Sequence, residues 1–330
     1  MHTSSFSESV VRPSGCPVAY DCRLVEEAVF LAVRRDAGPR AAGYQPQRNR
    51  VYEIKDPEIR ESRFRDLNRE WFVRLALREA LEQTLAERFP SSARLGRCQV
   101  FAAAARAEEM ADLWMPSADM LERSRAAGAE PSGTLVVWLL PESLVAPDAL
   151  RAFLRHEFLH VADMLDPAFG YERTLPVSDV GPAYDSLLRN RYRVLWDATV
   201  DGRLVREGAL DGRVREARYA EFARTFPMAG DRAVEQFAPW FDGPRPRHQD
   251  LVAFAVDPRS AGSDAVLHDG RCPICRFPVA QLDPRVSSMP DRTRRALARR
   301  HPSWRIEQGL CSQCFDLHEV DDEETANVSA

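Results

Sequence analysis

The sequence predicts an α+β protein, in which one main domain of short strands and longer helices is followed by a small cysteine-rich module. Residues 133–140 form a short apolar run rich in β-favouring side chains, bounded by Pro131 and Pro141, and they predict a strand. Residues 147–165 repeat apolar side chains at intervals of three to four, which predicts a helix soon after that strand. Two C-x-x-C pairs, separated by 35 residues, predict a metal-binding module near the end of the chain.

The N-terminal part is predicted to contain one dominant helix. Residues 1–20 contain Ser and Pro, and we expect them to be disordered. Residues 24–35 should form a short helix or strand, and residues 38–50 a loop. Residues 58–89 repeat large apolar side chains and predict a long amphipathic helix, which Pro90 ends. The aromatic side chains of this helix are expected in the core rather than around a cofactor.

A strand and a helix are predicted in the stretch that leads to the central helix. Residues 98–102 predict a strand and residues 105–114 a helix, both ahead of the strand at 133–140. The central helix has Pro147 in its first turn, where a proline removes no needed hydrogen bond. It should end near Asp166, which a proline follows.

The second half of the chain is predicted to be helical and then irregular. Residues 183–225 look helical, and residues 226–268 are rich in Pro, Gly and Asp, as expected of a linker or packed loop. The main domain is therefore expected over residues 21–225 and the cysteine-rich module over residues 269–318. An acidic, disordered tail is expected over residues 319–330.

The central helix carries an H-E-x-x-H motif, formed by His156, Glu157 and His160. Two histidines four residues apart project from one face of a helix, so both imidazoles can bind one metal ion. Glu157 is placed to contact a metal-bound water. The helix also has an apolar face roughly opposite the histidines. Its members are Leu150, Leu154, Phe158, Val161 and Leu165. This combination is the local chemistry of a zinc hydrolase.

A catalytic zinc normally has three protein ligands and one open position for water, so a third ligand is needed. Asp163 shares the face of the two histidines and is a candidate, either as a ligand or as an acceptor for an imidazole N–H. Asp166 stands at the spacing where metzincins carry their last ligand, but Asp163 stands where those proteins need a glycine. The metzincin pattern is therefore not met.

Asp197 and Asp201 are the preferred candidates for the third ligand. They lie four residues apart in the predicted helix over 183–225 and share one of its faces. The alternative is that both pair with nearby arginines on a solvated face. The arginines considered for this are Arg191, Arg193 and Arg203.

These segments resemble the zincin metallopeptidases over residues 97–205. The strand at 133–140 followed by the H-E-x-x-H helix carries the resemblance, and Asp197 with Asp201 is similar to the gluzincin E-x-x-x-D pattern, with Asp in place of Glu. The resemblance implies that the strand belongs to a sheet above an active-site cleft, with a sheet edge that pairs with extended substrate. It also implies that one aspartate binds the metal and the other orients a metal-bound histidine; which one does which stays open.

The implied function is that of a zinc-dependent metallopeptidase acting on a peptide or protein substrate. Zinc would lower the pKa of its bound water, and Glu157 would accept the proton and return it to the leaving group. Tyr171 and His248 are considered as transition-state donors on residue type alone, and neither is assigned that role. The alternative is a non-catalytic zinc-binding scaffold whose cysteine-rich module docks a protein partner.

Four cysteines are predicted to hold a second, structural zinc ion. They are Cys272, Cys275, Cys311 and Cys314. Two C-x-x-C turns present four thiolates to one tetrahedral metal and leave no open position, as in a zinc ribbon. The separation of 35 residues exceeds the about 15 to 20 of common ribbons, and a predicted helix over residues 291–301 accounts for the extra length. A redox dithiol is the rival hypothesis, but two such pairs favour metal. One catalytic and one structural Zn²⁺ are therefore expected.

Composition fits a soluble globular protein, since 45% of the 330 residues are hydrophobic and 29% are charged. The net charge of −5 argues against nucleic acid as a partner, and the run Arg292–Arg300 is the single feature in its favour. No secretory signal or membrane span is visible, and reduced C-x-x-C thiols are typical of the cytoplasm, where we expect the protein. Lys55 is the only lysine, which we interpret as the mark of a GC-rich bacterial genome.

Overall fold

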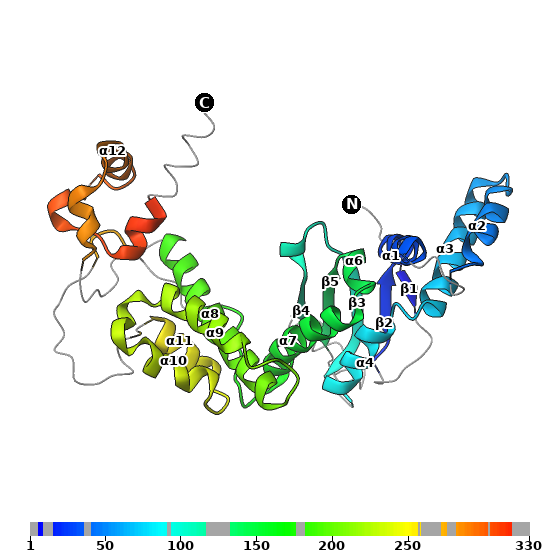
Figure 1. Ribbon diagram of the computed structural model, residues 1–330, viewed down its shortest axis with the longest axis horizontal. Coiled ribbons are helices and arrows are strands. Elements are labelled where there is room, and N and C mark those ends of the chain that lie inside the picture. Colours follow the sequence, from blue (N-terminus) through cyan, green and yellow to red (C-terminus); the bar gives the residue numbers. More distant parts are fainter. Residues whose placement is uncertain are drawn as a thin grey trace. The chain divides into compact units, whose positions relative to one another are not determined.

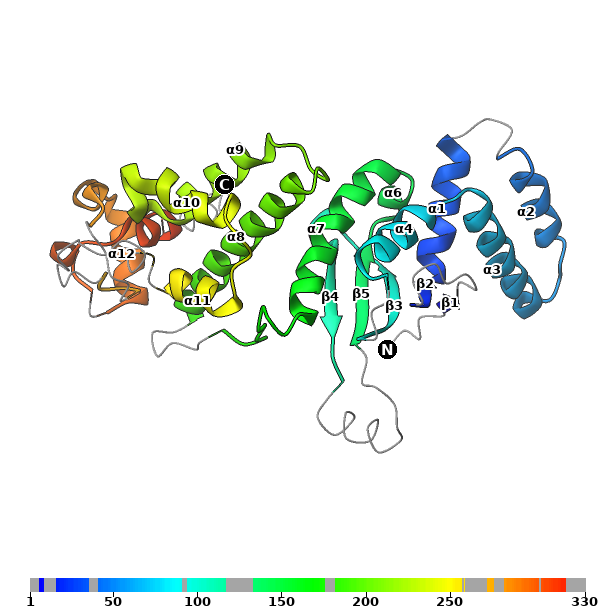
Figure 2. The ribbon, with the colours of Figure 1, turned by 90° about the horizontal axis from the view of Figure 1, so that it is seen from below.

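The computed structural model is an α+β protein whose elements are labelled in Figure 1 and shown turned by 90° in Figure 2. It describes residues 6–8, 16–35, 41–90, 94–116, 133–175, 182–256, 258, 272–275, 282–302 and 304–318. The chain forms two compact units. One contains Met1–Tyr171 and Glu207–Leu210, and the other contains Glu172–Arg206 and Asp211–Ala330. None of the described helices is long and apolar enough to cross a membrane.

The first unit is built on a mixed sheet of five described strands in the order β1-β2-β3-β5-β4. The strands are β1 (Phe6–Glu8), β2 (Val18–Asp21), β3 (Leu95–Ala102), β4 (Met110–Trp114) and β5 (Gly133–Leu139). Strands β2, β3 and β5 run parallel, while β1 and β4 are antiparallel to their neighbours. The predicted strand over 133–140 is therefore β5, an inner strand, and the edge strand beside it is β4.

Helices of the first unit share one apolar core with this sheet. They are α1 (Cys22–Arg35), α2 (Tyr44–Tyr52), α3 (Pro57–Arg74), α4 (Glu79–Arg88), α6 (Pro141–Leu144) and α7 (Pro147–Leu165). Helix α7 begins at Pro147, as predicted, and buries Leu154 and Phe158 completely. These side chains join Leu135 and Val137 of β5 in the same core. Each such side chain contributes about 1.5–3 kcal/mol when fully buried, so the apolar face holds α7 in place.

The long helix predicted over 58–89 is two helices, α3 and α4, and that prediction was wrong about its continuity. Ala76 adopts a φ of 59°, in the left-handed region. The N–H of Ala76 bonds to the carbonyl of Val73, and the N–H of Leu77 bonds to the carbonyl of Phe72. This is the Schellman arrangement that ends helices, normally with glycine at the left-handed position. Because the chain has alanine there, no residue type marks the break.

The helix predicted over 105–114 is also wrong, because residues 110–114 are the edge strand β4 after a short 3₁₀ turn (Arg106–Glu108). Side chains alternate along β4, with Ala111 and Leu113 buried and Met110 and Trp114 exposed. That period of two is the strand pattern, but five residues are too few to distinguish it from a helical turn.

Two N-terminal predictions need correction as well. Residues 1–20 were expected to be disordered, yet β1 and most of β2 lie there and pair with each other. The other residues before position 16 lie outside the described part of the chain. The loop expected over 38–50 contains most of α2, whose Tyr44 is buried and donates to Asn68 of α3 at 2.8 Å. The open choice at 24–35 is settled as helix α1.

The second unit contains the helices α8 (Pro182–Arg206) and α9 (Val214–Thr225), as the prediction over 183–225 requires. The segment 226–268, expected to be a linker or packed loop, instead contributes a 3₁₀ turn (Pro227–Arg232) and the helices α10 (Ala233–Phe241) and α11 (His248–Val256). A cluster of aromatic rings joins them. It includes Phe222, Phe226, Phe237 and Phe254. The Pro- and Gly-rich run over 243–246 lies in the connection between α10 and α11, where turn residues belong.

Helix α8 passes very close to the end of α10. A Cβ atom at Gly202 would lie 1.9 Å from the carbonyl oxygen of Phe241, so only glycine fits at this crossing. Gly202 therefore permits close helix packing in the middle of α8 and does not mark its end.

The cysteine-rich module has its own small core in the described residues. It contains the helix α12 (Asp291–Arg300), as predicted, two 3₁₀ turns (Pro284–Ser288 and Ile306–Gln308) and a helical turn over residues 312–318. The four ribbon cysteines pack with apolar side chains that include Leu297, Trp304 and Phe315. The tail expected over 319–330 lies outside the described residues.

Candidate metal centres

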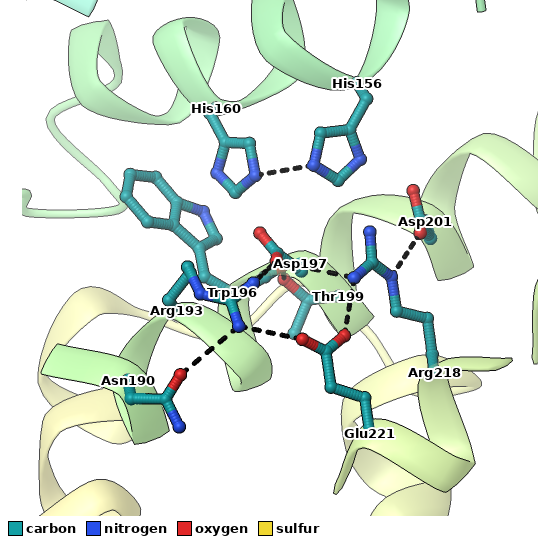
Figure 3. A network of polar contacts seen from close by, with 10 residues as sticks. All are labelled: His156, His160, Asn190, Arg193, Trp196, Asp197, Thr199, Asp201, Arg218 and Glu221. Atoms are coloured by element: carbon teal, nitrogen blue, oxygen red, sulfur yellow. Dashed lines mark hydrogen bonds and ion pairs between the residues drawn. The ribbon is translucent and has the colours of Figure 1, made fainter. Parts of the chain in front are cut away.

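His156 and His160 lie on successive turns of α7, and their rings meet edge to face (Figure 3). Their Nε2 atoms are 3.1 Å apart. Two nitrogens bound to one tetrahedral zinc at about 2.0–2.1 Å are about 3.3 Å apart, so the pair is arranged as two ligands of one ion would be. Both residues are half-buried.

Glu157 faces the edge strand β4. Its Oε2 atom accepts a hydrogen bond of 2.8 Å from the backbone N–H of Ala111. A carboxylate has a second oxygen that can accept a proton, so this contact orients the side chain without using its whole capacity. This bond was not predicted from the sequence. Ala111 was expected in a helix, where its N–H would bond within that helix.

The two aspartates that follow the motif on its own helix have different surroundings. Asp163 is 1% exposed and therefore lies inside the first unit rather than at an open site. Asp166 caps the end of α7, where its Oδ1 accepts from the N–H of Ala168 at 2.8 Å. The cap explains Asp166 without a metal, since an aspartate readily bonds the N–H two residues on.

Asp197 and Asp201 lie one turn apart on α8, and both are buried, at 7% and 2% exposure. Asp197 accepts from Arg193 at 2.7 Å, and Asp201 accepts from Arg218 at 2.5 Å. Arg218 also reaches Asp197 at 3.4 Å and Glu221 at 2.8 Å (Figure 3). The charges of Asp201 and Asp197 raise the pKa of Arg218 even though its burial acts to lower it.

This network changes the alternative that the sequence left open. Arg193 does pair with Asp197, but Arg218 comes from α9 and was not considered. The face is buried, not solvated. Removing one partner of these ion pairs would therefore lower the stability of the fold, because it leaves a buried charge without its partner. The spacing of residues on α8 could not indicate Arg218 and Glu221, because both lie on a different helix, α9.

The four ribbon cysteines come together as predicted. Cys272, Cys275, Cys311 and Cys314 offer sulfur atoms that all lie within 4.8 Å of one another. The Sγ atoms of Cys275 and Cys311 are 3.7 Å apart. Two sulfurs at about 2.3 Å from a tetrahedral zinc are about 3.8 Å apart, so the group fits that ion.

Backbone N–H groups point at two of these sulfurs. The N–H of Cys311 donates to Sγ of Cys272 at 3.5 Å, and the N–H of Cys314 donates to Sγ of Cys311 at 3.4 Å. Such bonds stabilise the thiolate, the form that binds metal. The chemistry of this group therefore favours a structural metal over a free dithiol.

His248 and Tyr171 were considered as transition-state donors, and the structure supports that role for neither. His248 is buried in the second unit, where its Nδ1 lies 2.7 Å from the hydroxyl of Tyr192. Burial lowers the pKa of His248. This partner accounts for His248 as an interior residue. Tyr171 is half-buried a few residues beyond α7 and gains no specific role.

No family model, no curated protein and no solved structure matches this chain. The resemblance to zincins therefore depends on the motif residues, and the geometry of each centre must be argued on its own.

Proposed function

We propose that this chain is a zinc-dependent hydrolase, and specifically a metallopeptidase, in which His156 and His160 hold the catalytic metal. The observation that carries the proposal is the convergence of two histidine Nε2 atoms, 3.1 Å apart, beside Glu157 on the same helix. A structural metal site needs the histidines but has no use for the glutamate. Following the E-x-x-x-D order of the gluzincins, Asp197 is the third ligand and Asp201 orients a metal-bound histidine.

A zinc ion bound there would supply a Lewis acid and an acidic water. The protein's own contribution is the base. Glu157 accepts the proton of the attacking water and later delivers it to the leaving amine, and a carboxylate in this role accelerates reactions by about 10²–10⁴-fold. Its bond to Ala111 fixes the carboxylate before substrate arrives.

The edge strand β4 supports a peptide as the substrate. In the described sheet β4 pairs with β5 on one side, and its other side is an edge. Sheet edges bind extended peptides through main-chain hydrogen bonds. Exposed Met110 and Trp114 on this strand offer apolar contacts to substrate side chains. We propose that an extended peptide lies along β4, next to Glu157.

The alternative function is a non-catalytic zinc-binding scaffold whose ribbon docks a protein. One observation favours it: Asp197 and Asp201 already have arginine partners, so their charges are balanced without a metal. Nucleic acid remains the less favoured partner, given the net charge of −5.

Zinc content and peptide hydrolysis test the proposal together. The purified chain is expected to hold two zinc ions and to cleave members of a mixed library of fluorogenic peptides. A His156→Ala, His160→Ala variant should hold one zinc and cleave none. The matched control is His301→Ala, His318→Ala, which removes another pair of neighbouring histidines, with ring centroids 5.7 Å apart in the ribbon, and should keep both zinc ions and full activity.

Each other result has a definite meaning. One zinc in both the wild type and the α7 variant would reject the histidine site and favour the scaffold. Two zinc ions without cleavage of any peptide would keep the metal centre and reject the peptidase.

A further inference from the structure

The edge strand β4 presents three side chains on its outer face. Met110, Asp112 and Trp114 alternate along the strand with the buried Ala111 and Leu113. Met110 and Trp114 are each 45% exposed, and Asp112 is half-buried between them. At intervals of two residues, this face therefore carries an apolar, an acidic and an apolar side chain, on a strand that forms one edge of the described sheet.

Asp112 supplies the negative charge at this edge. The residue opposite it on β5 is Val136, and none of the seven residues of β5 is charged. The Oδ1 atom of Asp112 accepts a hydrogen bond of 2.8 Å from the N–H of Leu113. Because that N–H has one hydrogen and gives it to a carboxylate, it points away from β5. The carboxylate of Asp112 therefore lies on the open side of the strand.

A peptide that adds to this edge aligns its side chains with those of β4. Residues directly opposite each other on neighbouring strands share a face of the sheet, with Cβ atoms about 4.5–5.5 Å apart. Ala111 and Leu113 direct their N–H groups to the open side, so Asp112 between them directs its peptide groups to β5. In an antiparallel pair, a residue in that position is the one whose side chain comes closest to its partner.

We infer that the peptide bound along β4 carries a basic residue with an apolar residue two positions away on each side, and that Asp112 selects the basic residue. The inference rests on the proposed function, which places an extended peptide on β4. Arg or Lys opposite Asp112 forms an ion pair, and opposite charges across strands attract whereas like charges repel. Apolar side chains on either side cover Met110 and Trp114. The pattern is symmetric, so it holds for both directions of the peptide.

Peptide binding tests the inference without requiring cleavage. The full chain with Glu157→Gln is mixed with short labelled peptides whose centre is Leu-Thr-Xaa-Thr-Leu, where Xaa is Arg, Gln or Glu. Fluorescence anisotropy should give affinities that fall in the order Arg, Gln, Glu, by about three- to fivefold at each step. Replacement of both leucines by alanine should weaken binding about tenfold.

Substitutions in β4 identify the residue that selects. Asp112→Asn keeps an acceptor for the N–H of Leu113 and should erase the difference between the Arg and Glu peptides, whereas Asp112→Lys should reverse it. Trp114→Ala should weaken binding of the leucine-flanked peptides and leave the order of Arg over Glu. Asp148→Asn is the matched control, because it removes the same charge from an exposed ion pair with Arg151, 3.0 Å long, and should change neither affinity nor order.

The mode of binding is checked with N-methylated peptides. Alternate N–H groups of an extended peptide point toward β4, and the others point away. Methylation of one alternate set should abolish binding, and methylation of the other set should be tolerated. Tolerance of both sets would show that the peptide does not pair with the strand and would overturn the inference.

The results separate this inference from the proposed function. Binding that follows the charge at position 112 without cleavage of any peptide by the wild type would reject the peptidase and keep β4 as a peptide-binding edge. Cleavage by the wild type with equal affinity for the three peptides would keep the peptidase and overturn the role of Asp112. Binding of none of the peptides, or an Arg preference that persists in Asp112→Asn, would overturn it as well.

Discussion

The carboxylate of Glu157 on helix α7 accepts a 2.8 Å hydrogen bond from the backbone N–H of Ala111 on the edge strand β4. An N–H has one hydrogen, so this amide serves Glu157 and not the ladder between β4 and β5. The next edge amide of β4 is engaged too, since the N–H of Leu113 donates to its neighbour Asp112 at 2.8 Å. On the proposed function, a peptide that pairs with β4 would displace these carboxylates from the amides, and substrate binding would therefore change the position of the proposed base.

Two substitutions at Glu157 should separate its chemical role from its structural role. Glu157→Gln keeps an acceptor for Ala111 but loses the base, so stability should stay within about 0.5 kcal/mol while hydrolysis falls about 10²–10⁴-fold. Glu157→Ala leaves the Ala111 N–H without its acceptor and should also cost about 1–3 kcal/mol of unfolding free energy. Denaturant unfolding and peptide cleavage measure the two effects.

The control for this pair is Glu87→Gln, which removes a carboxylate at an exposed ion pair with Arg155, 3.2 Å long. It should leave both stability and cleavage nearly unchanged. Full activity in Glu157→Gln would show that another group is the base.

Conservative changes at the α8 aspartates should distinguish ligand from supporting carboxylate. Asp197→Asn is expected to reduce the zinc content from two ions to one. Asp201→Asn should keep both ions but lower the affinity for the zinc ion at the histidine site about 10–100-fold, as loss of an orienting carboxylate does. Elemental analysis and chelator competition give these values.

Glu221→Gln is the matched control, because Glu221 contacts the same arginines, Arg193 and Arg218, and is not expected to touch metal. Exchanged results for Asp197 and Asp201 would reverse their roles. Retention of both ions in both variants would return Asp163 and Asp166 to consideration.

Thiol labelling should report metal in the ribbon. A brief alkylation of the native protein should leave the ribbon cysteines unmodified while zinc is bound and modify them after chelation, because the thiolates are the metal ligands. Cys98 is 0% exposed in the first unit, and burial raises the pKa of its thiol. It should stay unmodified in both states and serve as the internal control. Mass spectrometry of digests identifies the sites; ribbon labelling that is equal with and without chelator would contradict a metal-bound cluster.

Acid should weaken the second unit through His248. Burial lowers the pKa of His248, so the unfolded chain binds its proton first as the pH falls. The stabilising effect of the neutral ring is complete above the unfolded value of about 6.5 and is lost as the pH drops toward the folded value. At pH 7, His248→Gln should lower the unfolding free energy by about 1 kcal/mol, because the contact with Tyr192 is lost. Between pH 7 and pH 5, its unfolding free energy should fall by less than that of the wild type.

Unfolding free energies measured at saturating zinc across this pH range provide the comparison. His301→Gln, in the ribbon, is the control and should keep the pH dependence of the wild type. An unchanged slope in His248→Gln would mean that this ring does not drive the acid response.

Glycine at position 76 should stabilise the first unit. Ala76 is exposed and has a φ of 59°, a conformation that costs an L-residue about 1–2 kcal/mol and glycine very little. Ala76→Gly is therefore expected to raise the unfolding free energy by about 1 kcal/mol. Ala86→Gly, inside the regular helix α4, should lower it by about 1 kcal/mol. Denaturant melts of both variants check the sign, and a loss in Ala76→Gly would mean that the break between α3 and α4 has another cause.

Local patterns predicted the elements that carry strong signals. Helix α7 was predicted because Leu154 and Phe158 repeat at helical spacing after Pro147, and β5 because its apolar run is bounded by prolines. The turn at Ala76 and the strand at Ala111 were missed. In both places the deciding interactions are backbone hydrogen bonds that no residue type announces.

The sequence by itself determined which side chains can bind metal: two histidines one helical turn apart, and four cysteines in two C-x-x-C pairs. Ligand spacing within one helix or one turn is set by local geometry, so it is visible in the letters. Only the tertiary structure decided that Arg218 of α9 meets Asp197 and Asp201 and that Ala111 holds Glu157. These partners are distant in sequence, and packing between elements, which burial of apolar surface drives, is what brings them together.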